Sequence, residues 1–503
     1  MYNKRGNTIL VAVSAILVFI AVLKINLILA LFCFVPLFIV LQNSRKQYVK
    51  TGIVFGITLS LISFFWMIPG AQRFTGSSIL YGLLVFSFSA VVLTLYWMLL
   101  FTVFDFLQKE EQRKADVIMN AALAGCIWVL GEALLALLSL RMPWFLFRTG
   151  IAVSGNVYAI QPVSLLGVSI ATFVIVVVNY MIAYSLTAKN YKFLFLPVFL
   201  FAVYMMAGWG MYNNFAQQPT ALQPIKAAVL TENVPAEMRW DESSGDALVQ
   251  RLLGLAKAAV PLQPDIAVWT ESTVPWTYRK DDDFVNEILY ITKSGNITHI
   301  LGINSNADSA SVYNSVYSIQ PDGRVTARYD KRYLLGFIEQ RVAGIIFPFL
   351  SSGGYVVEPG TERQPLQTPY GKAGILICNE STISSAAADV VNNGAQFILN
   401  MSNDGWFADT YIAGQHFYNA RLRAVETRKD VVVNSNDGIT GLIKASGEIV
   451  HAQRSDEPSI DVATIQPNNF KSLATSSPYI MLYVSGIFVL LNAVIMLRVR
   501  VNK

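Results

Sequence analysis

Gly374-Ile375-Leu376-Ile377-Cys378-Asn379-Glu380 is the stretch of this chain that decides the fold. Small and branched apolar residues lead directly to a cysteine and then to a carboxylate. This pattern is typical of a buried strand that ends in a sharp turn and presents a thiol. Cys378 is also the one cysteine outside the long apolar segments, because Cys33 and Cys126 both lie within them. Two interpretations follow: Cys378 is a buried structural cysteine, or it is a nucleophile.

The composition indicates a membrane protein. Of the 503 residues, 54% are hydrophobic and only 14% are charged, which leaves too little polar surface for an ordinary soluble protein. The formal net charge of +5 is small for this length and is spread along the chain, so we expect no nucleic-acid partner.

Apolar segments long enough to cross a bilayer recur along the chain. We expect spans at Ile9–Leu23, Leu27–Leu41, Gly52–Pro69, Ile79–Phe104, Val117–Leu140, Val163–Leu186, Phe193–Met211 and Tyr479–Leu497. The first two segments are short, so they form either two separate spans or a hairpin that enters the membrane as a pair. The first is interpreted as retained rather than as a cleaved signal peptide, because no small-residue cleavage site follows it.

These spans divide the chain into three parts. We expect a membrane domain with about seven transmembrane helices at residues 1–211, a polar domain at residues 212–478, and a final helix with a short tail at residues 479–503. Lysine and arginine are concentrated in alternate short loops, and positive charge is retained on the cytoplasmic side during insertion. This alternation predicts that the polar domain faces outward, which in the inner membrane of a bacterium is the periplasmic side.

The polar domain alternates strand-like and helix-like segments, which predicts an α/β domain of two layers or a sandwich. Besides the segment that ends at Cys378, we expect strands at Ile225–Leu230, Ile266–Thr270, Thr298–Ile303, Val312–Ile319, Val325–Tyr329, Phe397–Met401, Val431–Ser435, Thr440–Lys444 and Ile460–Thr464. Helices are expected at Gly245–Val260, Asp282–Ser294, Ser384–Asn392 and Tyr411–Arg428.

Three side chains of this domain suit acyl transfer through a thiol. Cys378 would be the nucleophile. Glu271 follows an apolar strand, where partial burial would raise the pKa of its carboxyl toward that of a useful general base. Lys331 follows another strand and could donate to a developing oxyanion or favour a thiolate. Taken singly, a lysine or glutamate after a strand is usually solvated, so the hypothesis depends on the three together.

The order Glu271, Lys331, Cys378 resembles the Glu-Lys-Cys triad of the nitrilase (carbon–nitrogen hydrolase) superfamily. Asn403-Asp404-Gly405-Trp406-Phe407 resembles the segment that follows the nucleophile there. With its leading spans, outward domain and final span, the whole chain is similar to the apolipoprotein N-acyltransferases, the membrane-embedded family of that superfamily. Further matches are Trp240, Glu339, Glu380, Gln415-His416, Arg421, Arg423 and Glu426, and in the membrane part Trp128, Glu132, Pro143-Trp144, Gln161 and Asn179.

The chain departs from the family pattern at two places. Asn379 stands where the family usually has a tyrosine after the nucleophile. The loop after Lys331 reads Arg-Tyr-Leu-Leu-Gly-Phe-Ile-Glu, where the family typically has His-Leu-Val-Pro-Phe-Gly-Glu. These differences bear on loop geometry and on the preference for acyl chain or peptide, and they leave the triad intact.

The resemblance implies a multi-pass helical membrane domain joined to an α-β-β-α sandwich. It implies that Cys378 takes an acyl group from a phospholipid as a thioester, and that the free α-amine of the S-diacylglyceryl cysteine of an apolipoprotein then attacks it. Glu271 would be the base, and Lys331 would stabilise the oxyanion. The implied supporting or substrate-binding residues are Glu339, Glu380, Trp240, Trp406 and Asn379. Both tryptophans would be either pocket walls or ordinary core residues. No cofactor and no metal are implied.

Two other functions fit the same residues. A membrane-tethered amidase or nitrilase would pass the acyl group to water, although one membrane anchor would suffice for it. A catalytically silent membrane scaffold would not need an intact triad.

Two further features of the sequence each have two interpretations. Glu132 lies alone among apolar residues and is either functional or paired within the helix bundle. The apolar loop Gly344–Leu350 either dips into the bilayer as a lid or lies buried in the polar domain.

Overall fold

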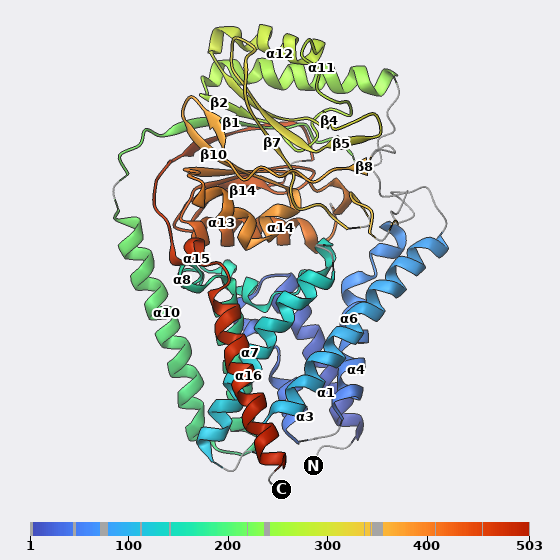
Figure 1. Cartoon of the computed structure of the whole chain (residues 1–503), viewed down its shortest axis with the longest axis vertical. Helices are drawn as coiled ribbons and strands as arrows, with labels where there is room; N and C mark the ends of the chain where they lie inside the picture. Colours follow the sequence, from blue (N-terminus) through green and yellow to red (C-terminus); the bar gives the residue numbers. More distant parts are fainter. Residues whose placement is uncertain are drawn as a thin grey trace. The chain divides into compact units, whose positions relative to one another are not determined.

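The computed structural model describes residues 4–43, 47–70, 79–110, 113–139, 142–218, 220–235, 242–336, 338–342, 344, 356–407, 409–454 and 456–501. The chain forms two compact units (Figure 1). The helical unit comprises Met1–Ser139, Trp144–Asn214 and Ser477–Lys503, and the sandwich unit comprises Leu140–Pro143 and Phe215–Ser476.

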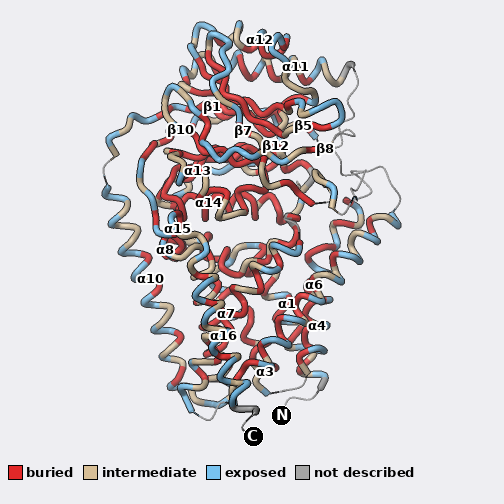
Figure 2. Tube along the Cα trace, viewed as in Figure 1, coloured by how far each residue is buried: buried red, intermediate tan, exposed pale blue. Residues whose placement is uncertain are grey.

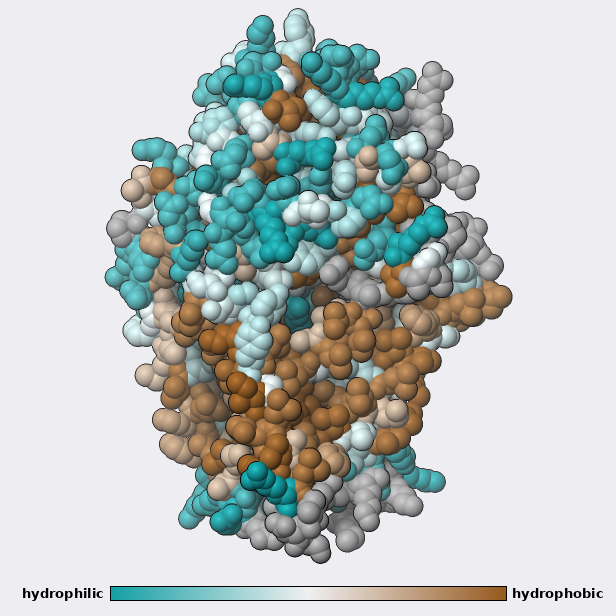
Figure 3. Space-filling view, viewed as in Figure 1, coloured by the Kyte–Doolittle hydropathy of each residue, from teal (hydrophilic) through white to brown (hydrophobic). Residues whose placement is uncertain are grey.

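The helical unit consists of apolar helices. They are α1 (Lys4–Val18, continued by a π-helical turn at Phe19–Leu23), α2 (Leu27–Ala30), α3 (Val35–Asn43), α4 (Tyr48–Phe64), α6 (Ile79–Leu107), α7 (Lys114–Leu138), α8 (Val163–Leu166), α9 (Val168–Thr187), α10 (Phe195–Ala216) and α16 (Ile480–Val501). Large hydrophobic side chains such as Leu84, Phe199 and Leu490 are exposed on α6, α10 and α16, and hydrophobic residues dominate the visible face of the unit (Figure 3). Such a surface suits contact with lipid and not with water.

Six helical segments in the described residues are long and apolar enough to cross a membrane. They are Arg5–Leu23, Ile79–Leu107, Lys114–Leu138, Val168–Thr187, Tyr191–Ala216 and Ile480–Arg498. The segments Leu27–Asn43 and Tyr48–Phe64 are shorter apolar helices. The chain is therefore a membrane protein, as its composition predicts, while a total of eight spans stays a prediction.

The predicted span Leu27–Leu41 contains two helices, because the segment is interrupted between α2 and α3. The side chain of Asn179, fully buried in α9, occupies the interruption. Its amide oxygen accepts from the Phe34 N–H at 2.8 Å, and its amide nitrogen donates to the Ala30 carbonyl at 2.8 Å. The backbone groups that a continuous helix would pair are thus satisfied by one side chain, as an apolar surrounding requires.

The contacts of Glu132 favour a structural interpretation of this carboxyl. One oxygen accepts from the Thr149 N–H at 2.8 Å, and the other accepts from the Thr172 hydroxyl at 2.8 Å. The carboxyl therefore connects α7 with the 3₁₀ turn Thr149–Gly155 and with α9, all within the helical unit.

In its described residues, the sandwich unit contains two six-stranded sheets and a smaller three-stranded one. The first sheet has the order β15-β1-β2-β3-β6-β7, with β15 Ser459–Ile465, β1 Ile225–Thr231, β2 Ile266–Val268, β3 Thr298–Gly302, β6 Ser315–Ile319 and β7 Val325–Asp330. The second has the order β14-β13-β12-β11-β10-β9, with β14 Ile449–Gln453, β13 Thr440–Ile443, β12 Val431–Asn436, β11 Phe397–Asn403, β10 Gly371–Ile377 and β9 Leu366–Thr368. The small sheet joins β4 (Ser305–Asn306), β5 (Ser311–Tyr313) and β8 (Val356–Val357).

The two large sheets pack face to face through apolar side chains such as Val229 and Val268 of the first and Ile375 and Leu399 of the second. Helices α11 (Glu242–Ala259) and α12 (Asp283–Thr292) cover the outer face of the first sheet, while α13 (Ser384–Asn392) and α14 (Tyr411–Thr427) cover that of the second. Figures 1 and 2 show these layers and the buried residues between them. The predicted α-β-β-α sandwich is confirmed.

One predicted strand of the sandwich unit was wrong. Val312–Ile319 is divided at Asn314 into β5 and β6, which belong to different sheets. The Asn314 carbonyl accepts from the Lys331 N–H at 2.8 Å, and its side chain turns toward Glu271. The alternation of apolar residues is similar on both sides of Asn314, so the pattern alone does not reveal the division.

Candidate active site

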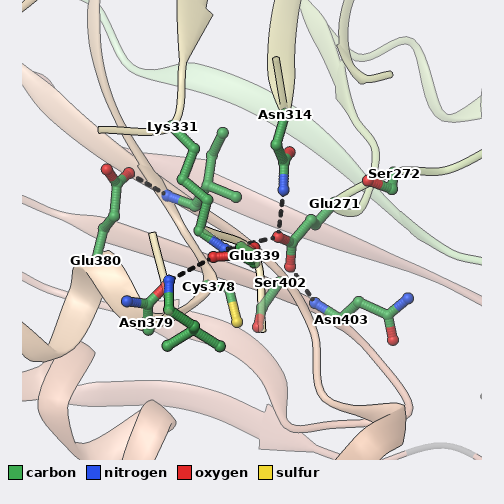
Figure 4. Close-up of polar contacts among 12 residues, drawn as sticks. Glu271, Ser272, Asn314, Lys331, Glu339, Cys378, Asn379, Glu380, Ser402 and Asn403 are labelled. Carbon is green, nitrogen blue, oxygen red and sulfur yellow. Dashed lines mark hydrogen bonds and ion pairs between the residues drawn. The ribbon is translucent and has the colours of Figure 1, made fainter. Parts of the chain in front are cut away.

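The predicted residues Glu271, Lys331 and Cys378 come together in the sandwich unit, each just after a strand (Figure 4). Glu271 follows β2, Lys331 follows β7 and Cys378 follows β10. Strands β1, β2 and β3 are parallel to one another, as are β10, β11 and β12. The carboxyl ends of parallel strands lie at one edge of a sheet, which is where α/β proteins usually place their ligands.

The backbone presents Cys378 in a strained turn. Its φ angle is +51°, in the left-handed region, and it begins the 3₁₀ helix Cys378–Thr382 directly after β10. For a residue other than glycine this conformation costs about 1–2 kcal/mol, and such strain is concentrated at functional sites. The side chain is only 6% exposed. The predicted strand followed by a sharp turn is therefore present.

Glu271 is held by donors on both oxygens. One oxygen accepts from the Asn314 side-chain amide at 2.7 Å and from the Lys331 ammonium at 3.2 Å. The other accepts from the Asn403 N–H at 2.9 Å. The carboxylate is 7% exposed, so these three donors replace the water that would otherwise solvate its charge.

Lys331 lies between two carboxylates and is 1% exposed. Its ammonium is 3.2 Å from Glu271 and 2.7 Å from Glu339. Burial by itself would lower the pKa of this amine, but the charges of Glu271 and Glu339 hold the pKa well above its ordinary value. The group is therefore a cation. These two bonds use two of the three N–H donors of an ammonium and leave the third for another acceptor.

The thiol of Cys378 is uncharged at rest. Burial, followed by the nearby Glu271 carboxylate, raises the pKa of the thiol well above its ordinary value, while Lys331 acts in the opposite direction. A group that is to react as a thiolate in this position needs a base to take its proton. Glu271 is a carboxylate close enough to act on that thiol electrostatically, and it is oriented by three donors.

The supporting carboxylates lie in two different places. Glu339 binds Lys331 directly, and its second oxygen accepts from the Leu335 N–H at 2.8 Å. Glu380 is fully buried. Its carboxylate accepts hydrogen bonds from the Tyr329 hydroxyl and from the N–H groups of Arg332, Tyr333 and Ile377, which lie close to Lys331 or Cys378 in the sequence. The structure thus connects the end of β7 to the start of the cysteine turn through Glu380.

Asn379 is 1% exposed, and its side-chain nitrogen donates to the Tyr333 carbonyl at 3.0 Å. Its side-chain oxygen is buried without a hydrogen-bond partner in the described part of the chain. Trp240 lies outside the described residues. The backbone of Trp406 belongs to the 3₁₀ helix Gly405–Phe407, but its side chain lies outside what the structure describes, as do residues 345–350 of the predicted lid Gly344–Leu350.

A buried polar group that the triad hypothesis did not include lies beside Cys378. His416 Nδ1 is 2.7 Å from Asp404 Oδ1, and ligand-type atoms of Cys378, Asp404 and His416 all lie within 4.8 Å of one another. Three such residues are a possible metal set. However, the two Asp404 oxygens already accept from His416, Ser402 and Ser435, and a metal would have to displace these donors. The arrangement therefore suits a hydrogen-bond network.

Asn314, Ser402 and the backbone N–H of Asn403 also belong to the site, and the triad hypothesis did not contain them. A signal for Ser402 was present in the sequence. Ser402 and Asp404 are two residues apart at the end of a strand, so their side chains lie on one face. The role of Asn314 had no such signal.

The family comparisons agree with this geometry. A model of the carbon–nitrogen hydrolases matches residues 235–475, and a model of the apolipoprotein N-acyltransferase N-terminal domain matches residues 14–181. The chain belongs to the apolipoprotein N-acyltransferase family. The sandwich unit is its carbon–nitrogen hydrolase part.

Individual relatives match over different lengths. The apolipoprotein N-acyltransferase of Allorhizobium ampelinum is 28% identical over 272 residues, which are 51% of this chain and 51% of that one, so the chain spans about half the length of this relative. The apolipoprotein N-acyltransferase of Vibrio vulnificus is 23% identical over 436 residues, 84% of each chain. Among solved structures, Nit3 of Saccharomyces cerevisiae, a member of the nitrilase superfamily, matches with 19% identity and a TM-score of 0.39 over 51% of this chain and 96% of its own.

Proposed function

We propose that this protein transfers a fatty acyl chain from a phospholipid, through a thioester on Cys378, to the free α-amine of the S-diacylglyceryl cysteine of apolipoproteins. The observation that carries the proposal is the placement of a buried, strained cysteine beside Glu271 and a Lys331 cation. Within the described part of the chain, the Lys331 ammonium uses two of its three N–H donors. Membership of the apolipoprotein N-acyltransferase family and the names of the curated relatives support the choice of substrates.

In the first step the thiol becomes a nucleophile. The Glu271 carboxylate takes the proton of Cys378, and the thiolate attacks the carbonyl carbon of a phospholipid ester. The carbonyl oxygen becomes an oxyanion, to which the free N–H of Lys331 donates. When the intermediate collapses, the carbon–oxygen bond breaks, Glu271 returns its proton to the departing alcohol, and a lysophospholipid leaves.

In the second step the lipoprotein amine attacks the thioester carbon. Glu271 takes a proton from the attacking amine, and Lys331 again stabilises the oxyanion. The carbon–sulfur bond then breaks, an amide is formed, and the proton held by Glu271 returns to the sulfur. Both half-reactions use the same base and the same cation, and Lys331 is held between the carboxylates of Glu271 and Glu339.

The membrane helices fit this reaction because donor and acceptor are both lipids. A domain free in solution would have to draw acyl chains into water at ~0.8 kcal/mol per exposed methylene. We propose that the helical unit lies in the inner membrane of a bacterium and that the active site faces the periplasm. The alternation of basic residues between short loops supports this orientation.

The experiment that tests the function offers both substrates to the purified full-length protein in phospholipid–detergent micelles. A synthetic peptide whose terminal cysteine carries a diacylglyceryl group should gain the mass of one fatty acyl chain at its α-amine. The same peptide acetylated at the amine should gain nothing, and Cys378→Ala should be inactive. Release of free fatty acid with no change in the peptide would replace the transferase by a hydrolase.

A further inference from the structure

Ser402 is placed to contact the reacting sulfur. In the second sheet Ile377 of β10 pairs with Met401 of β11, so Cys378 and Ser402 are the next residues along two adjacent parallel strands. Figure 4 shows the Ser402 side chain directed toward the sulfur of Cys378, and a hydrogen bond from this hydroxyl lowers the pKa of the thiol. Ser402 is 2% exposed, so water does not compete for its proton.

The Ser402 hydroxyl has two acceptors within reach and only one proton to donate. Its oxygen is 3.1 Å from Asp404 Oδ1 on one side, and the cysteine sulfur lies on the other. While the sulfur is protonated, the S–H can donate to the serine oxygen and the serine can donate to Asp404. Once the sulfur is an anion, it becomes the stronger acceptor, because hydrogen bonds to ionised groups are the stronger ones.

Asp404 can lose its hydrogen bond from Ser402, because other groups still donate to its carboxylate. His416 Nδ1 lies 2.7 Å from Oδ1, and the Ser435 hydroxyl donates to Oδ2 at 2.9 Å. With a carboxylate on that side, Nδ1 is the nitrogen that carries a hydrogen. Asp404 is 2% exposed, and a buried carboxylate that lost its donors would be destabilised. His416 and Ser435 remove that obstacle to reorientation of Ser402.

We propose that Ser402 is a further catalytic residue, which turns its hydroxyl proton to the Cys378 sulfur whenever that sulfur is an anion, and that Asp404 and His416 are positioning residues that hold it there. The proton stays on the serine oxygen throughout. The inference rests on the proposed thioester mechanism, in which the sulfur is an anion twice: before it attacks the phospholipid ester and when it leaves the amine adduct.

Other charged groups also face the sulfur and act independently of Ser402. Glu271 at the end of β2 and Asp404 at the end of β11 disfavour the thiolate, and Lys331 at the end of β7 favours it. Because the charge of Asp404 itself opposes the thiolate, Asp404 is useful to the reaction only through the hydroxyl that it orients.

The test measures how readily the Cys378 thiolate forms. Iodoacetamide is added to the full-length protein in micelles across a pH series, and alkylation of the Cys378 peptide is followed by mass spectrometry. Ser402→Ala should alkylate about tenfold to hundredfold more slowly at a given pH, the value of one hydrogen bond to a charged group, and its profile should move to higher pH. Ser402→Thr, which keeps the hydroxyl, should follow the parent protein.

Ser318→Ala is the matched control. Ser318 is a fully buried strand serine of the same unit whose hydroxyl bonds Thr326, so its loss should leave the pH profile unchanged. An unchanged profile for Ser402→Ala would overturn the role of Ser402. An unfolded Ser402→Ala would expose the thiol and give the pH profile of an ordinary cysteine, at lower pH than the parent protein, and the decision would then pass to the histidine variants.

Two variants of His416 separate positioning from direct proton transfer. His416→Asn keeps a side-chain N–H near the place of Nδ1 and should behave much like the parent protein, whereas His416→Leu removes the donor to Asp404 and should move the profile in the direction of Ser402→Ala. Equal defects in both variants would contradict the positioning role. Since alkylation needs neither phospholipid nor lipopeptide, this outcome is independent of whether the proposed acyl transfer is found.

Discussion

Glu380 provides a strong test of how the site is held together, because its carboxylate is fully buried and takes hydrogen bonds from four donors. Oε1 accepts from the N–H groups of Arg332 and Tyr333 at 2.8 and 3.1 Å, and Oε2 accepts from the Ile377 N–H at 2.9 Å. The Tyr329 hydroxyl lies 2.9 Å from Oε2. Arg332 follows Lys331 in the chain, and Ile377 precedes Cys378, so the carboxylate joins the two.

The cost of Glu380→Gln can be worked out from these donors. The least unfavourable orientation places the new NH₂ group at the position of Oε2, where the Tyr329 hydroxyl can turn to accept from it but the Ile377 N–H cannot. One buried N–H is then unpaired, which costs ~1–3 kcal/mol. A loss of ~2 kcal/mol lowers the melting temperature of a domain of this size by about 4–8 °C. Glu380→Ala unpairs three backbone donors and should lower it about three times as far.

The assay is thermal unfolding of the purified protein in detergent, followed by tryptophan fluorescence, together with acyl transfer well below the transition. Glu380→Gln should show both a lower melting temperature and reduced activity, because the turn at Cys378 loses a support, and Glu380→Ala should show more of both. An inactive Glu380→Gln with the melting temperature of the parent protein would refute the reasoning, since it would mean that Glu380 acts on the substrate and not on the backbone.

Three further predictions follow. Lys331→Ala should abolish turnover while the fold is retained, because several kcal/mol of oxyanion stabilisation are lost. Lys331→Arg should not restore turnover, since a forked guanidinium does not occupy the place of an ammonium. An active arginine variant would mean that only diffuse positive charge is needed. A thiol reagent that cannot cross membranes should reach Cys378 in intact spheroplasts, and labelling only in inverted vesicles would overturn the proposed orientation. Burial raises the pKa of Glu232 from 4.5 to about 7, so this carboxyl destabilises the fold progressively as the pH rises from about 4.5 to about 7. Glu232→Gln should therefore raise the melting temperature at pH 8 and have little effect at pH 4.5. An equal effect at both pH values would contradict the raised pKa of Glu232.

The elements that the sequence predicted well are those in which local pattern and tertiary role coincide. The branched apolar residues before Cys378 favour a strand and form one, and the order of Glu271, Lys331 and Cys378 after apolar segments is visible without a structure. The sandwich follows from the alternation of strands and helices, because each sheet must cover its outer face with helices.

The elements that were missed depend on single polar contacts between distant segments. Asn179 interrupts a helix that lies 145 residues away in the chain, and no local pattern near Leu27 shows it. Asn314 divides a strand because its carbonyl and side chain are needed by Lys331 and Glu271. Glu380 and the pair Asp404 and His416 were noted as family matches, but their donors could be named only from the structure.

The central claim is that Cys378 carries an acyl group between a phospholipid and an amine, and intact-mass measurement tests it most directly. Incubation of the protein with phospholipid and no acceptor should add the mass of one fatty acyl chain to Cys378, as a thioester that neutral hydroxylamine removes and that a diacylglyceryl lipopeptide with a free amine discharges. Cys378→Ser should form no such thioester. An adduct on Cys33 or Cys126, or an adduct on Cys378 that disappears as fast without the amine as with it, would contradict the claim.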